Sequence, residues 1–388
     1  MFEPKHYLAM PNKTKSRLKI ESIREFLRQL KVFISKIEIK KSLSYIREIK
    51  KTGKGYLWII FDYLSMLRKG FITFSEYYEY EFEKQESTFR NSFLGDVNSN
   101  RYYRLLNPPQ SKIIAKNKFV SHCILGTLGI PKARLILYYN PKMKNTKIVA
   151  SDYHGVAAIL KSQNAKEFVV KPATGLGGKN IYYFNKLEYL LDDILLHSST
   201  GLTIQLSELL QNEHLIFESY VNQTKQFSSF NPSSVNCLRF MTSLGLQGEV
   251  KIIGTTLKVG RSNSFVDNAG QGGNINAAVN LNSGQIYNVF QFDGFRRTKS
   301  ITHHPDTKSL IDGVTILDWE KIKAEIVNFH ECIPYLKIIG WDIAITSSGP
   351  KVIEMNCEAA ITPQLFLGKG WKNEITQCYR DWQRIQVD

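Results

Sequence analysis

The sequence lacks a disulfide framework and long apolar runs. Only five cysteines occur in 388 residues, widely spaced and without a Cys-x-x-Cys motif, which is typical of reduced thiols in a cytosolic protein. The most apolar stretch, residues 56–67, contains Asp62 and is shorter than the roughly 20 residues that span a bilayer. The basic N-terminus has no apolar segment of the kind found in signal peptides. We therefore expect a cytoplasmic protein, either free or at the inner face of the membrane.

Acidic residues are scarce at the N-terminal end. Residues 1–54 contain 15 Lys or Arg against 5 Glu and no Asp, so they supply +10 (15 minus 5) of the net charge of +16. An anionic partner would explain this imbalance, either a membrane surface or, less favoured, nucleic acid. A solvated helix face explains it equally well.

The first 95 residues predict a basic helical extension. Between Leu18 and Ile49, apolar residues from Ile23 to Ile37 recur at intervals of three and four, which indicates one amphipathic helix or, as we favour, two. Residues 56–67 and 75–82 predict two more helices. Such helices can lie on anionic lipid, although packing against a catalytic domain is commoner.

Since 388 residues are many for one core, we expect two or three subdomains.

Two short apolar runs near the C-terminus, residues 341–345 and 351–355, flank a Ser-Ser-Gly-Pro turn and predict a β-hairpin. Asp342 on the first strand, and Glu354 and Asn356 on the second, then share one face. Their oxygen atoms suit Mg²⁺, which usually shares its ligand shell with substrate phosphates. An ordinary pair of solvent-facing acids is the alternative, but Glu354 lies in an apolar run where an unpaired charge would be costly.

A glycine-rich hairpin is expected at residues 168–184. Lys171 ends a β-branched strand, and Gly175, Gly177 and Gly178 follow before the next strand. Glycines let backbone N–H groups approach phosphate, and a lysine on a strand is a fixed cation for the same oxygens. The loop matches neither Walker A nor the Rossmann fingerprint, and alone it is a weak indication of a nucleotide.

The rest of the chain predicts alternating helices and strands. Arg239 lies in an apolar strand and is expected to face an anion. The loop after Gly260 is too polar and glycine-rich for the core, so it is either a long turn or a loop that lines a substrate. The predicted helices are 116–128, 188–197, 319–332 and 379–384, and the predicted strands are 133–138, 215–221, 235–242 and 250–259.

Taken in order, these features resemble the ATP-grasp superfamily, and in detail its sugar-transfer-associated branch. The resemblance covers about residues 112–370, and the stretches that carry the narrower match include Asn236 to Arg239, Asp267-Asn268, His304-Pro and Gly340 to Ile345. It implies an α+β fold in which two subdomains clasp ATP and the glycine loop closes over it. The expected division is 1–95 (helical extension), 96–165 (N-terminal α/β subdomain), 166–222 (ATP-binding lid subdomain) and 223–388 (central subdomain with the metal site).

The resemblance also implies roles for individual residues. ATP would be bound by Lys118, Lys171, Gly175, Gly177, Gly178, Lys179, Glu218, Tyr220 and Val221, with Glu218 and the backbone at Tyr220 and Val221 beside the adenine. Mg²⁺ would be held by Asp342, Glu354 and Asn356. Arg239, and with it Arg261, would be catalytic, and Asn236, Asp267, Asn268, Gly272 and Gly273 would lie on the acceptor side.

The reaction implied is the ligation of a carboxylate to an amine through an acyl phosphate. It would form an amide on a sugar or sugar-linked precursor of a cell-surface polysaccharide, from either a uronic acid and an amine or an amino acid and an amino sugar. Residues 1–95 would contact an anionic membrane or glycosyltransferases. One alternative keeps the fold but stops at phosphoryl transfer, which makes the protein a kinase of a small polar or saccharide substrate. Another is a basic interaction protein that acts through residues 1–54 without catalysis.

Overall fold

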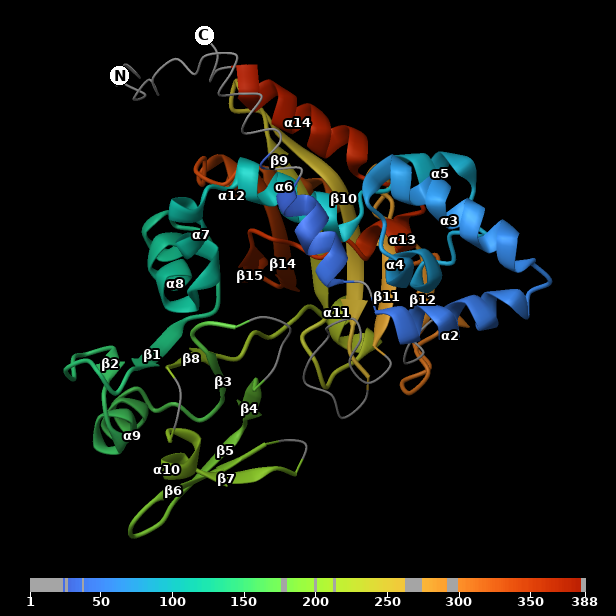
Figure 1. Cartoon of the computed structure of the whole chain (residues 1–388). Coiled ribbons are helices and arrows are strands. Elements are labelled where there is room, and N and C mark those ends of the chain that lie inside the picture. The colour runs from blue at the N-terminus through green and yellow to red at the C-terminus, as the bar shows by residue number, and fades with distance from the viewer. Residues whose placement is uncertain are drawn as a thin grey trace.

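The computed structural model describes residues 24, 27–36, 38–175, 180–198, 201–211, 214–261, 274–291 and 299–384. Helices and β-sheets are combined, which confirms the α+β class (Figure 1). Among the described helices, none is both long enough and apolar enough to cross a membrane.

A seven-stranded antiparallel sheet dominates the molecule. Its strand order is β13-β12-β11-β10-β9-β14-β15. The strands are β9 (Cys237–Leu244), β10 (Val250–Val259), β11 (Ile275–Val279), β12 (Ile286–Gln291), β13 (Lys299–Ser300), β14 (Ile338–Thr346) and β15 (Gly349–Asn356). The hairpin predicted near the C-terminus is confirmed as β14 and β15, which pair antiparallel.

Helices cover both faces of this sheet, and the alternation of side chains along each strand supplies both cores. Phe240 packs with Ile322, Ile326 and Phe329 of α12 (Trp319–Glu331) on one face. The next residue, Met241, packs on the other face. The helices there are α6 (Asp96–Leu106), α13 (Pro363–Leu367) and α14 (Lys372–Arg384), and α11 (Lys225–Phe230) precedes β9.

A second unit is built on a five-stranded sheet of order β2-β1-β8-β3-β4 and a three-stranded sheet of order β5-β6-β7. Its strands are β1 (Leu135–Tyr139), β2 (Val149–Ala150), β3 (Phe168–Pro172), β4 (Tyr182–Phe184), β5 (Lys186–Tyr189), β6 (Ile194–His197), β7 (Thr203–Gln205) and β8 (Leu215–Ser219), with helices α9 (Tyr153–Ser162) and α10 (Leu206–Leu209). The boundary expected at residue 165 falls within this unit, because β1 precedes it and pairs with β8.

The helix predicted at residues 188–197 is wrong. This segment contains part of β5 and all of β6, which pair antiparallel with Tyr189 opposite Ile194. The residues between the two strands, Leu190 to Asp193, form the turn. Apolar residues on both sides of a short turn imitate helical spacing, so periodicity could not separate the two structures.

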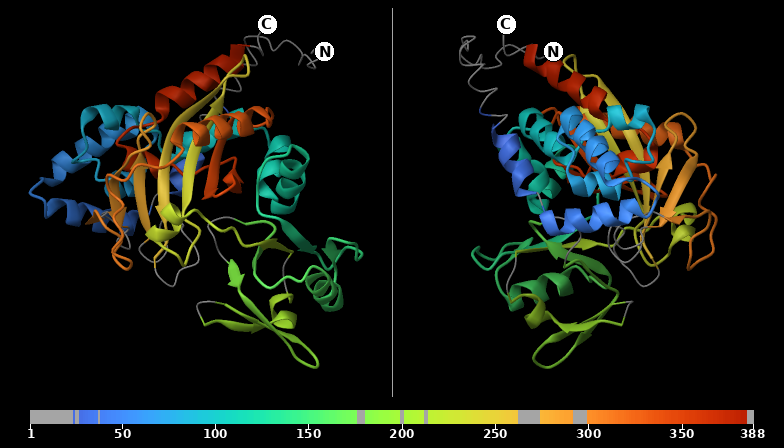
Figure 2. Two further views of the ribbon diagram at one scale, coloured as in Figure 1. Left: turned by 180° about the vertical axis from the view of Figure 1, so that it is seen from behind. Right: turned by 45° about the vertical axis from the view of Figure 1, so that its right-hand side comes forward.

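Helices at the N-terminal end pack on the side of the large sheet (Figure 2). They are α2 (Ile39–Lys50), α3 (Tyr56–Gly70), α4 (Phe74–Glu79) and α5 (Ser87–Ser92), and residues 27–35 are helical before them. Thr73 caps α4 in a capping box with Glu76. Their shared core includes Ile361, from the segment that follows β15. Further along the chain, α7 (Pro109–Lys116) and α8 (Lys118–Thr127) lie between the two units.

Candidate functional site

Three charged side chains form a row across adjacent strands of the large sheet. Arg239 on β9 lies directly opposite Asp342 on β14, and Asp342 lies opposite Glu354 on β15. Because directly opposed residues on neighbouring strands point to the same face, all three side chains project from one side of the sheet. The expectation that Asp342 and Glu354 share a face is therefore confirmed by the strand register.

Asp342 is held by two cations. Arg239 donates from Nε and Nη2 to the two carboxylate oxygens at 2.7 and 2.8 Å, and Lys258 Nζ on β10 lies 3.0 Å from Oδ1. Burial acts to raise the pKa of Asp342, but Arg239 and Lys258 outweigh it and hold the pKa well below its usual range. Asp342 therefore stays ionised and fixes both cations in place.

Asp342, Glu354 and Asn356, the residues proposed to bind Mg²⁺, differ in how far their side chains are already engaged within the fold. Glu354 pairs with Lys118 Nζ at 3.3 Å, and 28% of its side chain is exposed. Asn356 has a buried amide nitrogen with no hydrogen-bond partner in the described part of the chain, so that end of its amide is not held by the fold. Asp342, in contrast, already accepts from Arg239 and Lys258. Glu354 thus suits a metal that takes its remaining ligands from phosphate and water. Asn356 could add only its amide oxygen, because the unpaired nitrogen is a donor and does not bind a cation.

Lys118 lies where the start of α8 meets the glycine-rich loop. Asn117 caps α8 by accepting from the Val120 N–H at 3.1 Å. The backbone N–H of Lys118 donates to Ala173 O at 2.8 Å, and its Nζ donates to Gly175 O at 3.1 Å. Gly175 has a φ of +129°, a conformation that favours glycine. The loop therefore leaves β3 beside the amine of Lys118.

Lys171 and His122 both pair with one buried carboxylate. Lys171 Nζ on β3 contacts Glu218 Oε1 on β8, and His122 Nε2 on α8 lies 2.7 Å from Oε2. Burial acts to raise the pKa of Glu218, but Lys171 and His122 more than offset it and lower the pKa to about 2. Glu218, expected beside an adenine, is thus occupied with orienting Lys171. The Nδ1 atom of His122 has no partner within the described ranges.

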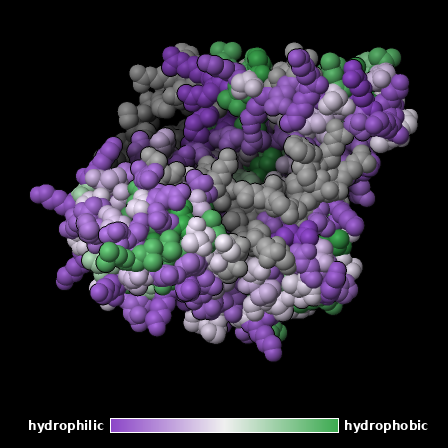
Figure 3. All heavy atoms as spheres, turned by 90° about the horizontal axis from the view of Figure 1, so that it is seen from below, coloured by the Kyte–Doolittle hydropathy of each residue, from purple (hydrophilic) through white to green (hydrophobic). Residues whose placement is uncertain are grey.

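These groups converge on a small cavity. Its wall includes Lys118, His122, Lys132, Lys171 and Glu354, which come from α8, the loop after it, β3 and β15. A volume of about 20 Å³ holds about one water molecule, so the cavity marks where the cations meet rather than the space for a nucleotide. Seen from the side where β5 to β7 lie, the molecule is hollowed in its middle, and hydrophilic residues lie along the upper edge of the hollow (Figure 3).

The structure adds three residues to the site that the sequence analysis did not identify: His122, Lys132 and Lys258. Burial lowers the pKa of Lys132, and Lys132 forms no ion pair with any carboxylate that the structure describes. Lys258 could have been found, because it lies inside an apolar strand as Arg239 does. His122 and Lys132 carry no comparable signal, since only the fold brings them to the cavity.

Other predicted residues are occupied elsewhere. Asn236 is fully buried, and its amide nitrogen donates to Phe227 O and Asn231 O. The side chain therefore stabilises a loop and does not point to a place where an acceptor substrate could bind. Arg261 forms two hydrogen bonds to Asp306, at 2.7 and 2.6 Å. Tyr220 lies against the ring of Tyr183 with 4.7 Å between centroids, and Val221 packs in a small buried cluster. The predicted residues Gly177, Gly178, Lys179, Asp267, Asn268, Gly272 and Gly273 lie outside the described residues.

Several solved structures are similar to this chain. D-alanine–D-alanine ligase from Bacillus anthracis is 13% identical over 71% of this chain and 69% of its own, with a TM-score of 0.38. D-alanyl-alanine synthetase A from Vibrio cholerae O1 biovar eltor is 13% identical over 72% and 68%, with a TM-score of 0.41. A biotin carboxylase–beta-gamma-ATP complex from Campylobacter jejuni is 9% identical over 70% of this chain but only 47% of its own, also with a TM-score of 0.41.

A search of curated proteins finds no match to this chain. A family model described as sugar-transfer associated ATP-grasp matches residues 97–380. That range covers most of the 388 residues and includes every site residue described above. The chain therefore has the ATP-grasp fold and belongs to the sugar-transfer-associated ATP-grasp family.

Proposed function

We propose that this protein is an ATP-dependent ligase that joins a carboxylate to an amine and forms an amide on a sugar or a sugar-linked precursor of a cell-surface polysaccharide. One observation carries the proposal: three cations line one small cavity together with Glu354, and two more are held by Asp342, which lies opposite Glu354 in the sheet. The cations are Lys118, Lys132, Lys171, Arg239 and Lys258, against the carboxylates Glu218, Asp342 and Glu354. This excess of positive charge suits a nucleoside triphosphate. The sugar context is supported by the description of the family.

The charges divide into two groups that could grip the two sides of a triphosphate. Lys118, Lys132 and Lys171 line the cavity next to the start of the glycine loop, where they would neutralise phosphate oxygens. Arg239 and Lys258 are held by Asp342 on the sheet, ready to stabilise the charge that develops on a transferring phosphoryl group. Glu354 and Asn356 would hold Mg²⁺, which supplies further neutralisation of the phosphate oxygens.

In the proposed reaction, a carboxylate oxygen of the substrate attacks the γ-phosphorus, and the bond from that phosphorus to the bridging oxygen of ADP breaks. The product is an acyl phosphate. The nitrogen of the amine substrate then attacks the acyl carbon, phosphate leaves with its oxygen, and the nitrogen gives up a proton. Positioning and charge stabilisation suffice for both steps, so the protein need not supply a nucleophile.

Hydroxylamine trapping tests this function. Full-length protein is incubated with ATP, Mg²⁺, hydroxylamine and a panel of uronic and amino acids. An acyl phosphate would be captured as a hydroxamate together with ADP release. ATP binding without a hydroxamate from any acid would contradict the proposal, and a phosphorylated product that survives hydroxylamine would favour a kinase instead.

Glu354→Gln is the matched variant for this assay. Replacing a charged oxygen ligand by an amide should reduce turnover by at least about a hundredfold through weaker metal binding. The circular dichroism spectrum and the melting temperature should change little, because the Glu354 side chain is partly exposed and glutamine has nearly the same shape. Turnover equal to that of the wild type would remove Glu354 from the site.

A further inference from the structure

Helix α3 carries an apolar face that the fold leaves uncovered. Ile59, Met66 and Gly70 are buried against the neighbouring helices. On the opposite side, Leu57 is 72% exposed and Phe61 is 68% exposed. The other exposed large apolar residues of α3 are Tyr56, Trp58, Ile60 and Leu64. Six large apolar side chains exposed on one helix of 15 residues form a patch of the kind that marks an interaction surface.

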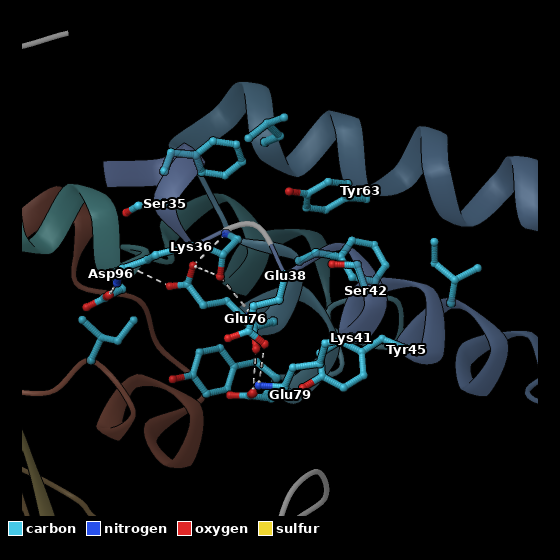
Figure 4. Close-up of a pocket in the computed structure, with 18 of the residues that line it drawn as sticks. Ser35, Lys36, Glu38, Lys41, Ser42, Tyr45, Tyr63, Glu76, Glu79 and Asp96 are labelled. Atoms are coloured by element: carbon cyan, nitrogen blue, oxygen red, sulfur yellow. Dashed lines mark hydrogen bonds and ion pairs between the residues drawn. The ribbon is translucent and has the colours of Figure 1, made fainter. Parts of the chain in front are cut away.

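The apolar patch continues into a pocket between α2 and α3. The pocket has a volume of about 780 Å³, and Ile60 and Leu43, both exposed, lie on its wall. Tyr45 and Tyr63 face the same space, and the charged residues gather on one side of it (Figure 4). An apolar group that meets the patch could therefore enter the recess as well as lie across α3.

Basic residues stand at both ends of α3. Lys50 and Lys54 precede the helix, and their amines lie 4.3 Å and 4.4 Å from the ring centroids of Tyr56 and Trp58. Arg68 and Lys69 occupy its last turn. The one acid within α3, Asp62, is half-buried and pairs with Arg90 at 2.6 Å. The exposed patch is consequently flanked by positive charge and contains no free acid among the described residues.

We propose that α3, with the adjoining part of α2, docks this protein on an anionic lipid surface. Apolar and aromatic side chains flanked by lysine and arginine match an interface in which acyl chains lie beneath negatively charged headgroups. A symmetric dimer through the same patch fits less well, because a two-fold axis would bring two basic ends together. With 15 residues, α3 lies along the surface and does not span it.

The helical hairpin of α2 and α3 is free to reach such a surface. It projects from one side of the molecule, and β14 and β15, which carry Asp342 and Glu354, lie towards the opposite side of the large sheet (Figures 1 and 2). Docking through α3 would therefore leave the site accessible. The net charge of +10 in residues 1–54 adds to the attraction.

Vesicle sedimentation of the full-length protein tests the proposal. In about 0.1 M salt, we expect it to sediment with vesicles of phosphatidylcholine and phosphatidylglycerol but not with phosphatidylcholine alone. The double variant Leu57→Ser, Phe61→Ser should bind anionic vesicles at least about tenfold more weakly. Leu317→Ser is the matched control, because Leu317 is 67% exposed and lies far from α3 in the chain; its binding should equal that of the wild type.

Three results would overturn the proposal. They are no sedimentation with anionic vesicles, equal sedimentation with neutral vesicles, and unchanged binding by the double variant. A dimer in light scattering that the double variant converts to monomers would identify the patch as a contact between copies and would also overturn it. ATP binding, measured in the same preparations, should be unaffected because α3 carries no site residue.

Discussion

At the scale of single residues, Lys132 is a partly buried amine whose charged form is destabilised by its surroundings. Burial lowers its pKa, and the structure describes no carboxylate paired with it. A triphosphate in the site would supply the missing negative charge. We therefore expect Lys132 to contribute to ligand binding more than to the stability of the free protein.

Replacing Lys132 by methionine separates these two contributions. Lys132→Met should weaken ATP binding about tenfold, because one charge-assisted contact to phosphate is lost. The free energy of unfolding should stay the same or rise, since no buried carboxylate loses its partner. Titration calorimetry and chemical denaturation measure the two quantities, with the exposed Lys321→Met as control. A loss of stability without a change in affinity would contradict the assignment.

Glu218 shows the opposite behaviour, because its carboxylate stabilises the fold. Its pKa lies at about 2, below the ordinary value of 4.5. The lowered pKa means that its contribution is fully present above about pH 4.5 and is lost as the pH falls from there towards 2. The loss is on the order of 3 kcal/mol.

Acid denaturation should reveal this contribution. The free energy of unfolding of the wild type should fall more steeply below pH 4.5 than that of Glu218→Gln, which cannot take up the proton. At pH 7 the variant should be less stable by a few kcal/mol, because Lys171 loses its buried partner. Parallel pH curves for the two proteins would show that Glu218 is not held in this way.

At the scale of elements, the β14 strand is fixed by a buried network as well as by its ladder. Trp341 Nε1 donates to Thr242 Oγ1 on β9 at 2.9 Å, and the same oxygen lies 2.7 Å from His330 Nδ1 on α12. His330 Nε2 donates to Leu336 O at 2.8 Å. The imidazole therefore ties α12 to the strand that carries Asp342.

Burial lowers the pKa of His330 from 6.5 to about 4. Its contribution to stability is thus present above pH 6.5 and is lost as the pH falls from 6.5 to 4, because the unfolded chain takes up the proton first. We expect His330→Gln to be less stable than the wild type at pH 7 and to lose less stability between pH 6.5 and 4. Thermal melts across that range measure both effects. An identical pH dependence would show that His330 does not titrate with folding.

The sequence predicted correctly those elements that neighbouring residues in the chain specify. The hairpin around residue 348 could be predicted because its turn residues and its two apolar runs are contiguous in the sequence. The pairing of Lys258 with Asp342 could not, because it depends on the spatial order β10-β9-β14, in which strands far apart in the chain become neighbours. The same holds for Lys171 and Glu218 on β3 and β8. The prediction of a helix at residues 188–197 failed because a tight hairpin and a short helix place apolar residues at similar intervals.

At the scale of the whole molecule, the N-terminal helices and the C-terminal segment form one packed body. Gly370 lies so close to the end of α5 that a Cβ there would be 2.0 Å from the carbonyl carbon of Ser92. Lys372 Nζ donates to Lys69 O at the end of α3. The atoms closest to Gly370 belong to the backbone of Ser92 and Phe93. A larger side chain at Gly370 would therefore require the backbone itself to shift.

Gly370→Ala should therefore destabilise the protein by about 2 kcal/mol or more. Gly55→Ala is the control, because a Cβ at Gly55 meets nothing within 4 Å and should change stability by less than about 0.5 kcal/mol. Denaturant melts of both variants measure the difference. Equal stability of the two would mean that the N-terminal helices are only loosely attached.

The amide of Gln364 sets a limit on how this protein can be shortened. It is fully buried, its oxygen accepts from Leu94 N at 3.0 Å and from Trp371 N at 2.9 Å, and its nitrogen donates to Leu94 O at 3.1 Å. Leu94 precedes the range 97–380 that the family shares. A polypeptide trimmed to residues 97–380 would lose both hydrogen bonds between the Gln364 amide and Leu94, and the buried amide would be left with unpaired polar atoms, which is costly. The solubility of the expressed protein should therefore depend on retaining the helices before residue 97.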